Sequence, residues 1–239
     1  PVTPKLRKLD LVVALLVVLP VWICDPLPLQ DLPSHEQVVA AMAHGLDWTG
    51  FAERLRMDWS PRAYALVYFV WAGLAKVFGV STSSRLLLTF ALGGGLLAML
   101  QWIRTLDPRK QDRALLAGLL VFSEFYYLGF VQLLVSLPFG FLLLARRTPP
   151  RDTPRPLRDE AVDALLLLAA YLCHPLGGFP AGVILVAFAL RSRTKTPEIA
   201  RALGRLLLVA LPCVLWHGAI ALWARPRGVP VEVDGAFGF

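Results

Sequence analysis

Charged residues are scarce in this sequence. Only 17% of the 239 residues are charged, whereas 56% are hydrophobic and the mean hydropathy is +0.60. A soluble domain usually carries about 25% charged residues. The shortage of charge therefore excludes an ordinary soluble protein, and we expect an all-α, polytopic bundle of transmembrane helices.

Three further signals are missing. The three cysteines, Cys24, Cys173 and Cys213, lie far apart without metal-ligand spacing, so we interpret them as small apolar residues in membrane helices. The net charge of +7 comes from short basic clusters between apolar runs, not from one stripe, which argues against a nucleic-acid partner. The glycine triplet at 93–95 lacks the Lys-Ser/Thr of a phosphate loop, and we expect it to permit close helix packing or a kink.

The ends of the sequence also differ from those of a complete chain. It begins with Pro1 and finishes at residues 229–239 without a polar tail after a long apolar run. We interpret residues 1–239 as a single transmembrane domain that forms the N-terminal part of a longer protein. The sequence does not indicate the oligomeric state.

Four basic clusters set the predicted topology. Apolar runs fall at 9–24, 63–80, 86–103, 114–122, 131–145, 164–173, 179–190 and 206–224. The clusters are Lys5, Arg7 and Lys8; Arg104, Arg109, Lys110 and Arg113; Arg146, Arg147, Arg151, Arg155 and Arg158; and Arg191, Arg193, Lys195, Arg201 and Arg205. The positive-inside rule places all four on the cytoplasmic side. The N-terminus is then cytoplasmic, and the chain crosses an even number of times between consecutive clusters.

One of the three apolar runs between the first two clusters therefore cannot span. Residues 63–80 are the best candidate, because they contain Lys76 and follow Trp59 at a helix start. We expect them to lie on the outer surface, so that residues 25–85 form an extracytoplasmic loop with two interfacial helices. The alternative, in which 63–80 spans, would place three of the clusters outside. Two outer turns follow, at 123–129 and at 174–180, where Pro and Gly residues are expected to break the helix.

The first outer loop carries the main candidate site. Ser34 and Gln37 are spaced as a capping box and predict a short amphipathic helix that stops near Gly45. Asp31 and His35 then flank the helix N-terminus, where partial positive charge favours an anion such as phosphate. A carboxylate fixed there can act as a base, and the imidazole can hold a phosphate, a metal or a proton. The alternative is that Asp31 only caps the loop and His35 is a solvated surface residue.

The order of several short motifs resembles a known family. A basic N-terminus and one span lead to an outer loop with the form Asp-x-Pro-x-His at residues 31–35 and an interfacial helix. Residues 64–80 (YALVYFVWAGLAKVFGV), the Ser-Ser-Arg-Leu at 83–86 and the Gly-Phe at 129–130 continue the likeness. This order, over residues 5–145, resembles the GT-C superfamily of membrane glycosyltransferases.

The resemblance implies transfer of a sugar from a polyprenyl-phosphate donor on the extracytoplasmic side of a bacterial inner membrane, in cell-envelope synthesis. Asp31 is the position that matches the first-loop catalytic aspartate, and Glu124 falls where the family often has a second acidic residue. With His35 they form the predicted catalytic set. The sequence has no adjacent acidic pair in the first loop and no Asp-x-Asp in the second. A divalent metal cofactor is therefore left open, with Asp31 and Glu124 as its only candidate ligands.

Outer-side polar residues are candidates for the lipid phosphate. Lys76, Arg85 and His174 all fall on the predicted outer side. Snorkelling of Lys76 and Arg85 to the headgroups, a helix-end role for His174 and an outer-turn role for Glu124 are the structural alternatives. His217 lies in an apolar run, and we expect a packed neutral histidine there.

Two other function classes stay open. The broken segment 174–180 and His217 within a span also suit a transporter or flippase subunit, although no internal repeat of convincing period is found. The third alternative is a catalytically inactive membrane scaffold. We expect Asp31, Glu124 and His174 to converge if the enzyme interpretation is right.

Overall fold

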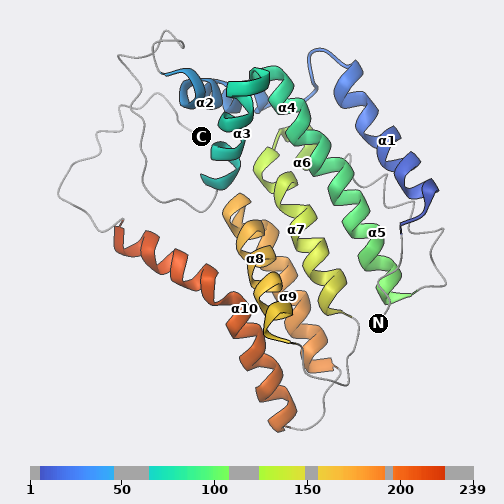
Figure 1. The fold of residues 1–239 in the computed structure, drawn as a ribbon, viewed down its shortest axis with the longest axis vertical. Coiled ribbons are helices and arrows are strands. Elements are labelled where there is room, and N and C mark those ends of the chain that lie inside the picture. The colour runs from blue at the N-terminus through green and yellow to red at the C-terminus, as the bar shows by residue number, and fades with distance from the viewer. Residues whose placement is uncertain (1–5, 46–64, 108–123, 149–155, 192–195, 224–239) are drawn as a thin grey trace.

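The fold is described from a computed structural model that covers residues 6–45, 65–107, 124–148, 156–191 and 196–223. Every regular element in these ranges is helical, which confirms the all-α prediction (Figure 1). The elements are α1 (Lys8–Ile23), α2 (Leu32–His44), α3 (Ala65–Phe78), α4 (Val80–Thr89), the π-helix Phe90–Gly94, α5 (Gly95–Leu106), α6 (Glu124–Leu128), α7 (Val131–Arg147), α8 (Leu157–Cys173), α9 (Pro175–Arg191) and α10 (Thr196–Trp223).

Some of the predicted features lie outside the described residues. They are Lys5, Trp59, the apolar run 114–122, residues 229–239, and the basic residues Arg109, Lys110, Arg113, Arg151, Arg155, Arg193 and Lys195.

Two helices in the described ranges are long and apolar enough to cross a membrane. The first is Val80–Leu106, which joins α4, the π-helix and α5 into 27 residues, and half of its most apolar window is buried within the molecule. The second is Thr196–Leu222, with only 6% of its window buried. The remaining apolar helices are shorter, and α1 has 16 residues.

The glycine triplet packs closely against its neighbours, as the sequence led us to expect. A π-helical turn runs from Phe90 to Gly94. A Cβ added at Gly93 would lie 3.1 Å from Val18 of α1, and the next two glycines face Pro138 of α7 at 3.7 and 3.8 Å. Small residues at this point therefore let the long central helix approach α1 and α7 together.

A large apolar cluster extends from the end of the bundle where α2 and α3 lie, which we call the α2 end, as far as Leu100 of α5. Trp71 of α3, Val39 of α2, Tyr126 of α6 and Cys173 of α8 all belong to it. Cys173 is 2% exposed, so the prediction of a buried apolar cysteine is confirmed there. Because Cys173 is the last residue of α8, this packing holds the α8–α9 connection at the α2 end (Figure 1).

The opposite end, which we call the basic end, contains buried ion pairs. Arg104 of α5 donates two hydrogen bonds of 2.5 Å to the carboxylate of Asp10 in α1, and both side chains are almost fully buried. Arg146 and Arg147 of α7 donate to buried Asp163 of α8 at 2.7 and 2.8 Å. A buried charge is tolerated when it is paired and hydrogen-bonded, so these contacts fix α1 to α5 and α7 to α8.

The predicted start of α2 was wrong. The α2 helix begins at Leu32, with Asp31 at the N-cap and Pro33 in its first turn, so Ser34 and Gln37 do not form the start of the helix. Proline suits the first helical turn because those N–H groups have no partner within the helix, and this preference outweighs the capping-box pattern. The end at Gly45, with φ of +94°, is as predicted.

The α8–α9 hairpin is tighter than the sequence suggested. Only His174 lies between the two helices, and Gly177, Gly178 and Pro180 are inside α9. Pro175 begins α9, where its missing N–H costs nothing. The glycines serve packing instead, since a Cβ at Gly177 would overlap Ser136 of α7.

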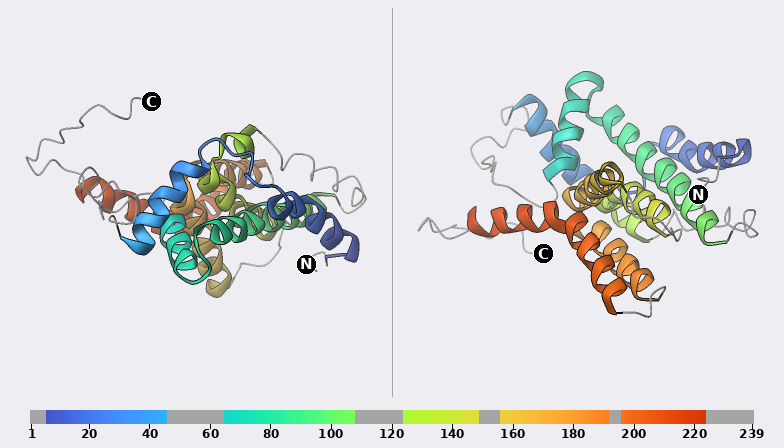
Figure 2. Two further views of the ribbon diagram at one scale, coloured as in Figure 1. Left: turned by 90° about the horizontal axis from the view of Figure 1, so that it is seen from above. Right: turned by 60° about the horizontal axis from the view of Figure 1, so that its bottom comes forward.

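The last helix bends away from the bundle. Pro212 lies inside α10, and an internal proline removes one helix hydrogen bond and favours a kink. The right-hand view in Figure 2 shows the C-terminal half of α10 turning outward from α8 and α9.

Candidate functional site

Three helices meet in a polar network at the α2 end. The hydroxyl of Tyr68 in α3 lies 2.7 Å from Nδ1 of His35 in α2. Nε2 of Gln132 in α7 donates to the Tyr68 hydroxyl at 2.9 Å and lies 3.3 Å from Nδ1 of His35. The network therefore joins residues separated by 33 and 97 positions in the sequence.

Aromatic packing fixes the orientation of this network. Tyr68 stacks on Trp71, with ring centroids 6.5 Å apart and an interplanar angle of 13°. The His35 ring lies 6.4 Å from Trp71, which is fully buried in the core. The α3 residues follow one face of the helix, because Val67, Trp71 and Ala75 recur at four-residue spacing. This face packs α3 against the core, and Tyr68, the residue after Val67, contacts His35 and Gln132.

Asp31 is placed by the backbone of the α6–α7 connection. Its N–H donates to the carbonyl of Leu128 at 3.3 Å, and the neighbouring Gln30 N–H donates to Tyr127. Gly129 has φ of +83°, and a Cβ there would lie 2.8 Å from the Asp31 nitrogen. A glycine is therefore needed both for the turn and for the close approach of Asp31.

The carboxylate of Asp31 is partly exposed and is not used to cap α2. Among the described residues it has no side-chain hydrogen bond. The electrostatic influence of Asp31 reaches His35, where it raises the imidazole pKa. Burial has the larger, opposite effect, so the pKa of His35 lies below its ordinary value. His35 is consequently neutral at pH 7, next to a carboxylate that is available to a ligand.

A second contact holds α2 in place beside the network. The hydroxyl of Ser84 in α4 donates to the carboxylate of Glu36 at 2.5 Å, and the same hydroxyl lies 2.9 Å from the Val80 carbonyl. Ser84 is 1% exposed. Since Glu36 adjoins His35, this bond restrains the first turn of α2 and the direction of the imidazole.

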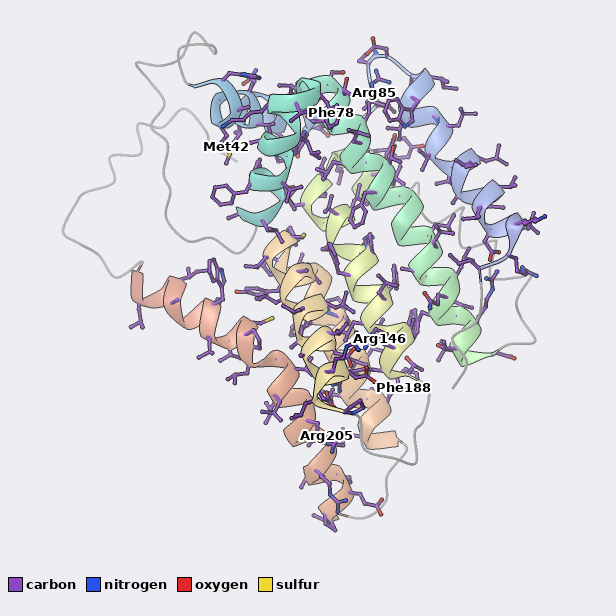
Figure 3. All side chains as sticks on the ribbon, viewed as in Figure 1. Met42, Phe78, Arg85, Arg146, Phe188 and Arg205 are labelled. Atoms are coloured by element: carbon purple, nitrogen blue, oxygen red, sulfur yellow. The ribbon has the colours of Figure 1, made fainter. Side chains whose placement is uncertain are left out.

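The other predicted residues have different surroundings. Arg85 donates to the Val21 carbonyl at 2.8 Å and pairs with Asp25 at 3.4 Å, so it ties α4 to the end of α1 (Figure 3). Lys76 is exposed in the last turn of α3. Glu124 is the first residue of α6, but its side chain lies outside the described part of the structure.

His174 lies at the same end of the bundle as Asp31. Its Nδ1 accepts a hydrogen bond from the Leu176 N–H at 3.2 Å, and burial lowers its pKa. His217 is exposed on α10 and lies 2.7 Å from the Tyr171 hydroxyl. The packed histidine expected at position 217 is therefore wrong: the side chain is exposed, although its ring contacts Tyr171 of α8 edge-on.

Sequence reasoning missed three members of the site. Gln132 is the one amide in the apolar run 131–145, and an amide buried to 8% exposure needs partners. That isolated amide was the available signal. Tyr68 and Trp71 had no comparable signal, because an aromatic residue in an apolar helix is usually explained by packing or by interface anchoring.

No group of three or more His, Cys, Asp or Glu side chains in the described ranges is arranged to hold a metal ion. Comparison with protein-family models, with curated proteins and with solved structures finds no match to this chain.

Proposed function

We propose that this protein is a membrane glycosyltransferase that moves a sugar from a polyprenyl-phosphate donor to an acceptor on the extracytoplasmic side of a bacterial inner membrane. The observation that carries the proposal is the pairing of an available Asp31 carboxylate with a neutral, oriented His35. The pair lies at the end of the bundle opposite the buried arginines of the basic end. A general base needs this combination of access and fixed position.

The arrangement of helices supports a membrane location. The long helices Val80–Leu106 and Thr196–Leu222 have the length and apolarity to cross a bilayer. The last turn of α3 carries Lys76, which is exposed. A cation at this position favours an interfacial α3 over the alternative in which it spans.

In the proposed reaction Asp31 removes the proton from the acceptor hydroxyl as its oxygen bonds to the anomeric carbon of the donor sugar. The bond from that carbon to the phosphate oxygen breaks, and the polyprenyl phosphate leaves with the electron pair. We assign the phosphate to His174 and Lys76, because Arg85 is already engaged by the Val21 carbonyl and Asp25. Glu124 stays a prediction, as a second acid or as a metal ligand with Asp31.

The test is Asp31→Asn in purified protein reconstituted into vesicles. The substrates are a panel of polyprenyl-phosphate hexoses and pentoses, radiolabelled in the sugar, with an extract of envelope acceptors. Loss of the general base should lower transfer about 10²- to 10⁴-fold. The matched control is Asp107→Asn, the same substitution at the C-cap of α5 at the basic end, and its transfer should equal that of the unsubstituted protein. Equal transfer by Asp31→Asn and the control would refute the proposal.

One observation favours transport as a second candidate function. His217 is an exposed imidazole in the part of α10 after residue 205, where the described residues are otherwise apolar and mostly unburied, and ionisable residues within membrane helices often mark a substrate path. If no donor in the panel is consumed, movement of a labelled lipid donor between leaflets that depends on His217 would favour the transporter. If neither activity is found, the catalytically inactive membrane scaffold would be the remaining candidate function.

A further inference from the structure

Hydrogen-bond donors surround Nδ1 of His35. The Gln132 amide nitrogen carries only hydrogens, so its approach to Nδ1 at 3.3 Å requires a lone pair on that ring nitrogen. Because Nδ1 then carries no proton, the 2.7 Å contact between Nδ1 and the Tyr68 oxygen is one in which the tyrosine hydroxyl donates. A neutral imidazole has one N–H, and this arrangement assigns it to Nε2.

Nε2 of His35 is the free position of the ring. It has no hydrogen-bond partner among the described residues, and it is not one of their buried, unsatisfied atoms. It can therefore donate to a ligand at the surface of the network. Metal binding through Nε2 would instead require the proton to move to Nδ1, where it would face the amide hydrogens of Gln132. The network accordingly favours an oxygen ligand over a metal at this nitrogen.

The neighbouring carboxylate narrows the choice of oxygen ligand. Asp31 lies four positions before His35, and residues four apart lie on the same face of a helix with Cβ atoms about 5–6 Å apart. A phosphate oxygen at Nε2 would be repelled by Asp31. A hydroxyl group can instead accept from Nε2 and donate to the carboxylate, which satisfies all three groups at once.

We infer that Tyr68 and Gln132 are positioning residues that hold His35 as an Nε2–H donor, so that His35 and Asp31 together bind the reacting hydroxyl of the sugar acceptor. This inference rests on the proposed function for the identity of the ligand. The tautomer of His35, however, is a property of the protein alone and can be measured without turnover. Four histidines in the whole chain make that measurement practicable.

The first experiment is nitrogen NMR of protein labelled at its histidine rings, in lipid nanodiscs at pH 7, with His35 assigned by the signals lost in His35→Gln. We expect a protonated Nε2 and an unprotonated Nδ1. Gln132→Leu should give a mixture of both tautomers. Ser136→Ala is the matched control, because Ser136 lies one turn further along α7 and donates only to the Leu133 carbonyl; it should leave the His35 signals unchanged.

Gln132→Glu keeps the test decisive if the leucine variant fails to fold. Its carboxylate would accept the Tyr68 proton and attract a proton to Nδ1, so the pKa of His35 should rise. The other charged groups near His35 are Asp31 and Glu36 on α2, and the described residues of α7 in contact with the ring contribute only Gln132. Protonated Nδ1 in the unsubstituted protein, or His35 signals unaffected in both Gln132 variants, would overturn the inference.

The second experiment compares two replacements of His35 in the transfer assay. The glutamine amide nitrogen can reach the place of Nε2, whereas that of asparagine reaches only the place of Nδ1. His35→Gln should therefore transfer about tenfold faster than His35→Asn, the effect of one hydrogen bond. Gln132→Leu should raise KM for the acceptor and leave KM for the lipid donor unchanged. Equal rates for the two His35 variants, or a changed donor KM, would contradict the assignment to the acceptor hydroxyl.

The glycosyltransferase function and the positioning role of Tyr68 and Gln132 can be refuted independently. Transfer that depends on Asp31, together with the wrong His35 tautomer, would refute the positioning role and keep the glycosyltransferase. The expected tautomer without transfer that depends on Asp31 would keep the positioning role and refute the glycosyltransferase.

Discussion

A single methyl group at Gly177 should separate α7 from α9. A Cβ built on Gly177 would collide with both Oγ and Cβ of Ser136, closer than the 3.0 Å that real Cβ atoms keep. The two helices also approach closely at Gly140 of α7, where an added Cβ would lie 3.1 Å from the Gly177 carbonyl. No rotation of the serine relieves its own Cβ, so the helices themselves must move.

The expected cost follows from this geometry. Overpacking a close contact usually costs about 1–3 kcal/mol, and Gly177→Ala should destabilise the protein by about 3 kcal/mol because both residues in the collision are held in helices. Gly182→Ala on the same helix is the matched control, since no atom lies within 4 Å of its added Cβ. Alanine is the better helix former, so the control should be stabilised by about 0.5–1 kcal/mol.

Moving the small residue across the interface should restore the fit. Ser136→Gly alone should cost about 1 kcal/mol as a glycine within a helix. In the double variant Ser136→Gly/Gly177→Ala the new methyl would meet the Cα of residue 136 at 3.5 Å, an ordinary contact. The double variant should therefore lose at least about 2 kcal/mol less than the sum of the two single losses.

The assay is equilibrium unfolding in mixed micelles, followed by tryptophan fluorescence and by helical circular dichroism, with coincident transitions as the two-state test. Equal stability of Gly177→Ala and Gly182→Ala would show that α9 does not approach α7 as described. Additive losses in the double variant would show that Ser136 is not the residue in contact. Either result would also place His174, three residues before Gly177, somewhere else.

Two further predictions concern the two ends of the bundle. Arg104→Met removes two hydrogen bonds of 2.5 Å from the buried Asp10 carboxylate, leaves it with the more distant Arg7 at 3.6 Å and should cost about 3 kcal/mol, whereas Asp10→Leu/Arg104→Met should cost less in the same unfolding assay; equal losses would show that the pair is not buried. Gly129→Ala should push back the Asp31 nitrogen 2.8 Å from its Cβ and lower transfer at least tenfold beyond Gly79→Ala, which has a similar φ of +79° but open space around it. Equal transfer by the two alanine variants would show that Gly129 does not position Asp31.

Periodicity and composition predicted the helices well. The apolar runs 9–24, 131–145 and 206–224 correspond to α1, α7 and α10, each within a few residues at the ends except for the earlier start of α10. The helix after Asp31 was predicted, but its start was placed at Ser34. Capping residues and first-turn prolines give competing local signals, and Pro33 decided the outcome.

The partners of polar residues could not be predicted in the same way. Asp31 and His35 are neighbours in the sequence, so their proximity followed from one helix turn. Gln132 reaches His35 across 97 positions, and Arg104 reaches Asp10 across 94. Such pairs depend on how the helices pack, and hydrophobic periodicity specifies which face is buried without specifying the neighbour.

Contacts in the structure also indicate that the four basic clusters lie at one end of the bundle, independently of the positive-inside rule. That rule grouped the four basic clusters on one side; contacts in the structure bring a member of each to the same end. Arg7 and Arg104 share the carboxylate of Asp10, and Arg147 and Arg205 share that of Glu160. The two groups are joined because Trp102, two residues before Arg104, donates from Nε1 to Thr148 at the end of α7 at 3.0 Å.

Figure 3 shows Arg146 and Arg205 toward this end and Arg85 at the other. Side-chain pairing and loop charge are independent physical effects, one acting between packed helices and the other between loops and a membrane potential. Their agreement on which residues lie together means that a membrane, if it crosses this bundle between its ends, leaves Asp31, His35 and His174 on one side. An inserted label that reached position 31 and position 205 from the same side would break that agreement and remove the shared location on which the proposed chemistry depends.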